Sequence, residues 1–281
     1  MPTHGSHWEA ICGLERYTQE IVTRDFEQSE LIGSADCVDV INDTERSEEV
    51  ACLRYGSRRI SNDLLVVTDS RKDEWLPFTA YPVLHDGIVH PVTIRTVRPW
   101  QHGIEAWIDG CITSEQRPIT WFDTHYWRDS TVLRPGVTVD ISLAALAYEL
   151  RPVDRRLPRR SGHPVRHVQH ERRFDTGGPP SETGLTMLWP GRSAPFLPCG
   201  DSDNPDDWLF RGVIKNLDVL DHDGLDVYRL EMDFRHPGDL TISLPVFVSE
   251  HALDGYIPRL DANVEGRLWL QGKLADPTRT E

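Results

Sequence analysis

Hydrophobic and polar residues alternate along most of the chain after residue 76, in short runs that end at turns rich in Gly, Pro or Asp. The runs that predict strands are 90–97, 103–110, 118–125, 137–148, 208–214, 225–234, 240–248 and 263–274. A two-residue period over many short segments is typical of a β-barrel or sandwich and not of a βαβ sheet. We therefore expect a mainly β protein, although the Ala and Leu of 142–150 also favour a helix.

The first 75 residues have a different pattern. Apolar residues recur at helical intervals from residue 7 to about 25, after a Ser6/Glu9 pair with capping-box spacing. We expect an amphipathic helix that packs on the adjacent domain; a docking helix for a partner is the alternative. A short strand at 37–41 and a hairpin of 50–55 with 59–68 complete a small α+β cap over residues 1–75.

Two parts of the chain have a similar order of segments. Residues 118–125 lead through a polar stretch into 134–143, and residues 240–248 lead through a similar stretch into 258–270. Each copy reads as a strand, a short irregular or helical insert, a Pro-containing turn and a closing strand. This repetition predicts two tandem OB-like barrels, with a sandwich built from both copies as the alternative. The expected units are a first barrel over 76–150, a Pro/Arg-rich strap over 151–204 and a second barrel over 205–281.

Three motifs carry a resemblance to other proteins. Trp-Phe-Asp-Thr at 121–124, Ser-Leu-Ala-Ala-Leu-Ala-Tyr at 142–148 and Gly-Arg-Leu-Trp-Leu-Gln-Gly at 266–272 resemble motifs of a group of uncharacterised bacterial proteins. The resemblance covers roughly 76–150 and 205–274, and the Pro- and Arg-rich strap departs from it. It implies a bacterial cytoplasmic origin and brings no known activity.

Composition narrows the class of protein. The 281 residues carry a net charge of −15, which favours solubility and disfavours a general nucleic-acid or anionic-membrane surface. No run approaches the ~20 apolar residues that span a bilayer, and the N-terminus lacks a secretory signal pattern. The five cysteines are scattered without CxxC pairing. We therefore expect a protein of the reducing cytoplasm without a disulfide framework.

The strap is a local exception to the acidic composition. Between residues 151 and 173, eight arginines against Asp154 and Glu171 give a charge of +6, which leaves −21 for the rest of the chain. These arginines are Arg151, Arg155, Arg156, Arg159, Arg160, Arg166, Arg172 and Arg173. One interpretation is an arm that contacts phosphates, since guanidinium groups and counterion release suit them. The other is a strap held on the protein's own acidic surface or on an acidic partner.

The aromatic segment 121–127 holds the candidate chemistry. On a strand, Trp121, Asp123 and His125 share one face, so Trp121 and Trp127 are candidates for stacking on bases, and Asp123 with His125 for acid–base catalysis. The structural alternative is a core strand whose Asp123 caps a turn. His163, His167 and His170 have metal-ligand spacing, but Pro164 opposes a helix there and no further ligand is evident. We expect no metal and no cofactor.

These observations give three hypotheses for function. The first is a non-enzymatic accessory or adaptor protein that binds another macromolecule, with a protein partner or a homo-oligomer preferred. The second is a module that binds single-stranded nucleic acid through the strap and the exposed aromatic residues. The third is a hydrolase centred on Asp123 and His125. The absence of P-loop, GxGxxG, GxSxG and HExxH motifs favours the first.

Overall fold

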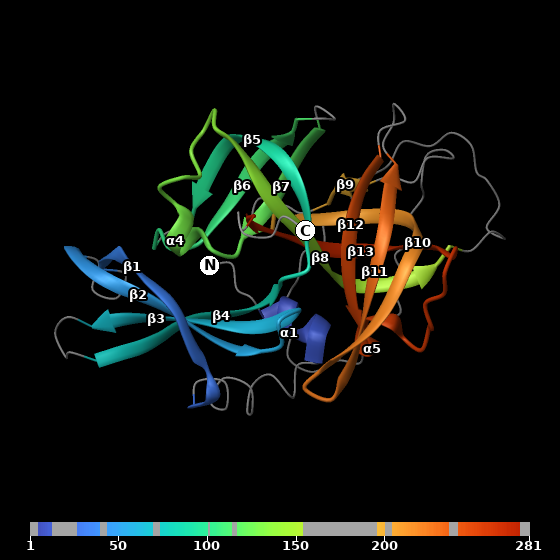
Figure 1. Ribbon diagram of the computed structural model, residues 1–281, viewed down its shortest axis with the longest axis horizontal. Helices are drawn as coiled ribbons and strands as arrows, with labels where there is room; N and C mark the ends of the chain where they lie inside the picture. Colours follow the sequence, from blue (N-terminus) through green and yellow to red (C-terminus); the bar gives the residue numbers. More distant parts are fainter. Residues whose placement is uncertain are drawn as a thin grey trace, which may run out of the picture. The chain divides into compact units, whose positions relative to one another are not determined.

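The structure of the protein, a computed structural model, describes residues 5–12, 27–39, 44–69, 74–100, 102–113, 117–153, 196–199, 204–235 and 241–275. The described residues belong to one compact unit. They are mainly β, as the sequence predicts, and their strands form a four-stranded and a nine-stranded sheet (Figure 1). No helix among them is long and apolar enough to cross a membrane.

The four-stranded sheet is antiparallel and has the strand order β1-β2-β3-β4. Its strands are β1 (Glu30–Asp39), β2 (Thr44–Gly56), β3 (Ile60–Asp69) and β4 (Glu74–Leu84). The β2–β3 pair confirms the expected hairpin, and β1 begins seven residues before the expected short strand at residue 37. Strand β4 runs across residue 76, where the sequence pattern placed the start of the first barrel. Helix α1 (Gly5–Cys12) matches the first part of the expected helix, and residues 13–25 lie outside the described part.

The nine-stranded sheet contains all the strands that alternation predicted after residue 88. Its strands are β5 (Ile88–Pro99), β6 (Ala106–Ile112), β7 (Arg117–Asp123), β8 (Thr138–Pro152), β9 (Phe196–Pro198), β10 (Asp207–His222), β11 (Leu225–Arg235), β12 (Thr241–Ser249) and β13 (Asn263–Leu274). A short helix, α4 (Tyr126–Asp129), lies between β7 and β8. Helix α5 (Glu250–Leu253) lies between β12 and β13. Both halves therefore follow the order of three strands, a one-turn helix and a fourth strand.

Strands β8 and β13 join the two halves. They pair antiparallel from Val264↔Pro152 to Leu274↔Ile141. Strand β13 also pairs parallel with β7 of the first half, and β8 pairs parallel with β12 of the second. The remaining pairings are antiparallel. They connect β8-β5-β6-β7 on one side and β13-β10-β11-β12 on the other, and β9 pairs with β10. The four strands of each half therefore form a closed cycle of pairings together with the fourth strand of the other half, which is β13 for the first half and β8 for the second.

Strand β8 shows how tertiary packing overrides local propensity. Its run of Ala and Leu favours a helix in isolation, but every residue from Leu143 to Ala147 is buried. Ala145 and Ala147 lie in one hydrophobic cluster, and Ala144 and Leu146 lie in the other. Because these side chains are small, the strand can bury both of its faces. An amphipathic helix would bury only one face.

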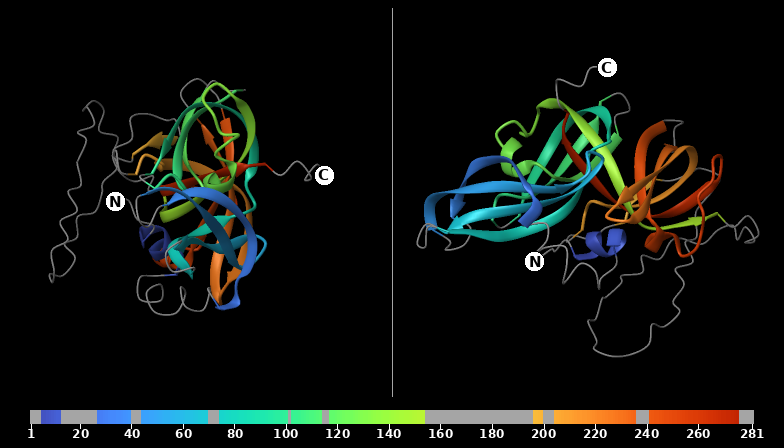
Figure 2. Two further views of the ribbon diagram at one scale, coloured as in Figure 1. Left: turned by 90° about the vertical axis from the view of Figure 1, so that its left-hand side faces the viewer. Right: turned by 60° about the horizontal axis from the view of Figure 1, so that its bottom comes forward.

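The two hydrophobic clusters cover the opposite faces of the nine-stranded sheet. On β7, Trp121 belongs to the first cluster and its neighbour Phe122 to the second. The second cluster also contains Trp8 of α1 and Tyr81 of β4, so it joins the helix and the four-stranded sheet to β7. Helix α1 packs against β4, β8 and β12 (Figure 2).

A single side chain of β13 links the two sheets by hydrogen bonds. The Gln271 amide oxygen accepts a bond from the Leu84 backbone N–H at 3.0 Å, and its nitrogen donates to the Pro82 carbonyl at 2.7 Å. The Tyr81 hydroxyl adds a bond to the Thr124 carbonyl at 3.0 Å. These buried bonds fix the end of β4 next to the turn that follows β7, where the candidate site lies.

Candidate functional site

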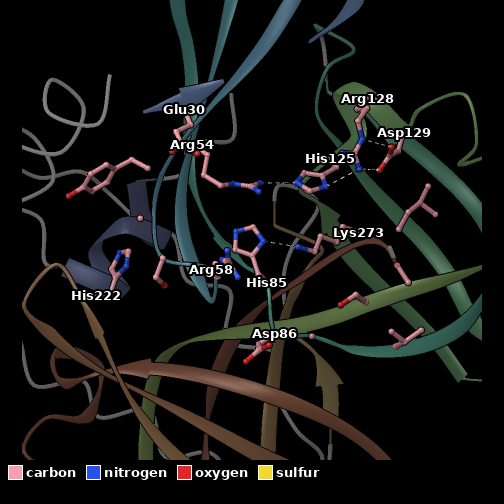
Figure 3. Close-up of a pocket in the computed structure, with 18 of the residues that line it drawn as sticks. Glu30, Arg54, Arg58, His85, Asp86, His125, Arg128, Asp129, His222 and Lys273 are labelled. Carbon is pink, nitrogen blue, oxygen red and sulfur yellow. Dashed lines mark hydrogen bonds and ion pairs between the residues drawn. The ribbon is translucent and has the colours of Figure 1, made fainter. Parts of the chain in front are cut away.

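A half-open groove of about 1570 Å³ lies where the two sheets meet (Figure 3). The four-stranded sheet contributes the β2–β3 turn, and the segment 85–87 follows β4. The nine-stranded sheet contributes the β7–α4 turn, the end of β13 and the β10–β11 turn. The walls of the groove therefore come from segments that are far apart in the sequence.

Asp63 is the buried anchor of the groove. Its side chain has no exposed surface, and it accepts bonds from Arg54 Nε at 2.7 Å and Arg54 Nη2 at 2.5 Å. The two residues face each other on the paired strands β2 and β3. A bidentate guanidinium–carboxylate pair fixes the geometry of both partners. Asp63 therefore holds the Arg54 guanidinium at the inner end of the groove.

A chain of hydrogen bonds runs from Lys273 to Asp63. Lys273 Nζ lies 2.8 Å from His85 Nδ1, and His85 Nε2 lies 2.7 Å from Ser61 Oγ. The Ser61 hydroxyl in turn donates to Asp63 Oδ1 at 2.8 Å. Because an ammonium group can only donate, the direction of the chain is fixed: Lys273 donates to His85, which donates to Ser61. Ser61 is fully buried, and its hydroxyl donates to the Asp63 carboxylate. Because His85 donates to Ser61 and does not accept its proton, His85 does not activate Ser61 as a nucleophile.

His125 lies between two guanidinium groups. Arg54 Nη2 is 3.2 Å from its Nε2, and Arg128 Nη2 is 3.3 Å from its Nδ1 (Figure 3). Arg128 is itself held by a bidentate pair with Asp129, at 2.8 and 3.0 Å. Burial, followed by the charges of Lys273 and then of the two arginines, lowers the pKa of His125 well below its usual value. The imidazole is therefore neutral at neutral pH.

Asp123, the expected partner of His125, contacts its backbone. The carboxylate accepts a bond from the His125 backbone N–H at 3.1 Å and one from Trp121 Nε1 at 3.4 Å. This arrangement caps the turn after β7, which is the structural alternative that the sequence left open. Burial, and then the charge of Asp129, raises the pKa of Asp123 to about 7. The Asp63 carboxylate lies near the His125 ring, with 3.9 Å between Nε2 and Oδ2.

Of the other predicted site residues, the structure describes Trp121, Trp127 and Arg151, and none of these lines the groove. Trp121 and Trp127 are 0% and 4% exposed, so neither indole presents a face on which a base could stack. Arg151 lies in β8 and forms an ion pair with Glu265 at 3.3 Å. Arg155, Arg156, Arg159, Arg160, Arg166, Arg172 and Arg173, with the three strap histidines, lie outside the described residues.

Sequence reasoning missed the groove residues Arg54, His85, Arg128 and Lys273, and also Asp63, which holds Arg54. Asp63 and Ser61 lie within the apolar hairpin strand, where a polar residue with no exposed surface needs a partner. These polar residues within an apolar run of the sequence therefore indicate a buried polar interaction. No signal in the sequence pairs His85 with Lys273, which are 188 residues apart.

A second buried acidic site lies at the start of β10. Asp206 accepts a bond from Trp269 Nε1 at 2.6 Å, and the Tyr148 hydroxyl donates to Asp207 at 2.9 Å. Burial, and then the neighbouring Asp207 charge, raises the pKa of Asp206 to about 7. Asp206 and Asp207 are therefore two adjacent buried carboxyl groups.

Comparisons with known proteins identify no relative: no family model, curated protein or solved structure matches this chain. Within the described ranges, no group of three or more His, Cys, Asp or Glu side chains is placed to hold a metal ion.

Proposed function

We propose that this chain is a non-enzymatic adaptor that binds a protein partner, or a second copy of itself, through the groove between its two sheets. The observation that carries the proposal is the mixed charge of the groove. Four basic and five acidic side chains line it: Arg54, Arg58, Arg128 and Lys273, with Glu30, Asp86, Asp129, Asp221 and Asp223. A lining of both signs suits a protein surface, which also carries both, better than it suits a polyanion.

The hydrogen-bond directions disfavour a hydrolase centred on Asp123 and His125. Both ring nitrogens of His125 face guanidinium groups, and Asp123 bonds to the backbone. A general base needs a free lone pair directed toward the proton that it removes. Burial raises the pKa of the Cys52 thiol, which donates to Asp63 at 3.6 Å and so provides no nucleophile in its place.

We further propose that each cycle of pairings is an OB-like barrel, in preference to a sandwich. We number β5, β6, β7, β8 and β13 as strands one to five of the first cycle. Neighbouring strands then follow the order 1-2-3-5-4. The third and fifth strands are parallel, and α4 lies between the third and fourth. The second cycle repeats this order with β8 as its fifth strand. An OB-like barrel is a five-stranded Greek-key structure of this kind.

This topology makes single-stranded nucleic acid the second candidate ligand, because OB folds bind oligonucleotides on the face of their second and third strands. In the first cycle that face is occupied. Phe122 of β7 is fully buried, with its ring 5.1 Å from Tyr81 of β4 and 5.5 Å from Trp269. The protein's own four-stranded sheet thus covers the face that a nucleic acid would use, which favours the adaptor.

The adaptor proposal is tested by site-specific photo-crosslinking. A photoreactive residue replaces Arg58, which is exposed in the groove, and a matched variant carries it at Arg95, which is exposed on β5 outside the groove. We expect a crosslinked protein from the source lysate, or a crosslinked dimer of the chain, at position 58 only. Asp86→Lys in the same groove should abolish the product, and the purified partner should reproduce it. Equal products at both positions would contradict the proposal.

A further inference from the structure

The inner end of the groove has an excess of positive charge, although the chain as a whole is acidic. Arg54, Arg128 and Lys273 lie around the His125 ring, and their charges all lower its pKa. Two carboxylates offset them, Asp63 and Asp129. With the His125 imidazole neutral, these five charged groups sum to +1 in a protein whose net charge is −15. We call Arg54, Arg128, Lys273 and His125 the basic floor.

The basic floor also contains hydrogen-bond donors without acceptors. A neutral imidazole has one N–H and one lone pair, so His125 accepts a bond from only one of its two arginines. The arginine from which the ring does not accept a bond directs its N–H toward the ring N–H. Among the described residues, Arg54 Nη1 has no acceptor within hydrogen-bonding distance.

These donors are accessible from the groove. The Arg54 side chain is 26% exposed and that of Arg128 is 47% exposed, while the carboxylates that hold them are nearly buried, at 0% and 10%. The two guanidinium groups therefore keep a fixed position and present N–H groups to the groove. Fixed guanidinium donors are the usual recognition elements for carboxylates and phosphates.

We propose that the basic floor is a subsite for a single oxyanion group of the bound protein, a carboxylate or a phosphate monoester. This inference rests on the proposed function and specifies what the partner must present. The excess of one positive charge suits one anionic group. The other acidic residues that line the groove, among them Glu30, Asp86 and Asp223, favour basic neighbours beside that group. A run of phosphates, as in a nucleic acid, would be repelled by the same acids.

The subsite is tested first without a partner, with inorganic phosphate as the probe. Phosphate is titrated by calorimetry at constant ionic strength, maintained with chloride. We expect saturable binding of one ion per chain, weakened about tenfold by Arg128→Gln and by Lys273→Gln and unchanged by Arg95→Gln. Circular dichroism and urea unfolding confirm that each variant is folded. Binding that does not saturate, or that is equally strong in the two floor variants, would overturn the subsite.

Short capped peptides then identify the anion. Their central residue is Glu, phosphoserine or Gln, with lysines on both sides. We expect the Glu or the phosphoserine peptide to bind at least about tenfold more tightly than the Gln peptide, and Arg128→Gln to remove the difference. Equal affinity for all three peptides would overturn the inference. If phosphate binds at the basic floor but no crosslink forms at position 58, the adaptor proposal is contradicted. The basic floor would then be an anion site for a smaller ligand.

Discussion

Arg54 and Asp63 form a bidentate ion pair in which the carboxylate is completely buried and the guanidinium is 26% exposed. The pair connects the core of the four-stranded sheet to the groove, because the same Arg54 Nη2 lies 3.2 Å from His125. A buried carboxylate cannot lose its partner without a large cost, since water does not replace the lost bonds. The position of the basic floor therefore depends on the core of the β2–β3 hairpin.

Removing the Arg54 side chain should destabilise the protein strongly. Arg54→Ala leaves Asp63 buried and unpaired, and we expect the free energy of unfolding to fall by about 3 kcal/mol. Arg54→Lys, which keeps the charge but loses the fork, should cost less. Arg58→Ala, at an exposed neighbouring position, should stay within about 0.5 kcal/mol of the parent protein. Urea denaturation measures all three, and similar values for Arg54→Ala and Arg58→Ala would show that the pair does not support the fold.

Asp206 should make stability depend on pH. Its pKa in the folded protein is about 7, above the usual value of 3.8, so the native state binds the proton more tightly than the unfolded state does. The resulting stability is fully present below about pH 4 and is lost as the pH rises to about 7. Asp206→Asn removes this loss and still offers an oxygen to Trp269 Nε1. We expect the variant to gain up to about 1 kcal/mol per pH unit relative to the parent protein across this range.

Urea unfolding at several pH values between 4 and 8 measures this difference. Asp123, whose pKa is also about 7, is present in both proteins, so its contribution cancels. Asp226→Asn, at an exposed position of β11, is the control substitution. Parallel curves for the parent protein and Asp206→Asn would show that the folded carboxyl group is not protonated.

Single-stranded nucleic acid should bind weakly or not at all at physiological salt. The net charge of −15 opposes it, and Tyr81 and Trp269 cover Phe122 on the outer face of β7. Fluorescence anisotropy of labelled DNA and RNA at low and physiological salt measures the binding. The matched variant replaces Arg155, Arg156, Arg159 and Arg160 with Ala. Tight binding that falls steeply with salt and disappears in this variant would establish the strap as a nucleic-acid arm and favour the second candidate function.

The sequence predicts the strands well because each has its own local pattern. The alternating runs that begin at residues 90, 225 and 263 all lie within observed strands. The candidate site does not have a local pattern of this kind. His125 could be singled out from its aromatic segment, but its ring neighbours Arg54 and Arg128 come from β2 and α4, and only tertiary packing brings them together. The alternation predicts that Asp123 and His125 share a strand face, but β7 ends at Asp123 and its carboxylate bonds to the His125 backbone in the turn that follows.

The sequence pattern also does not predict that β8 and β13 pair with strands of the other half. Alternation shows that β8 and β13 are strands, but it does not show which strands they pair with. Two similar halves are compatible with two separate units or with one shared sheet. The choice depends on contacts such as that between Gly272 and Trp121, which are formed only when β13 lies beside β7.

That contact gives the last prediction. Gly272 lies in β13 between β7 and β8, and a Cβ atom at this position would overlap the buried Trp121 indole. Because the ring is fully buried and has little room to move, Gly272→Ala should lower the free energy of unfolding by about 2–3 kcal/mol. Gly136→Ala is the matched control, since Gly136 has a φ of +86° but no atom within 4 Å of an added Cβ. Its backbone strain alone should cost about 1 kcal/mol. Urea denaturation ranks the two variants, and a smaller effect for Gly272→Ala would mean that β13 does not lie against Trp121, which would remove the shared pairing of the two halves.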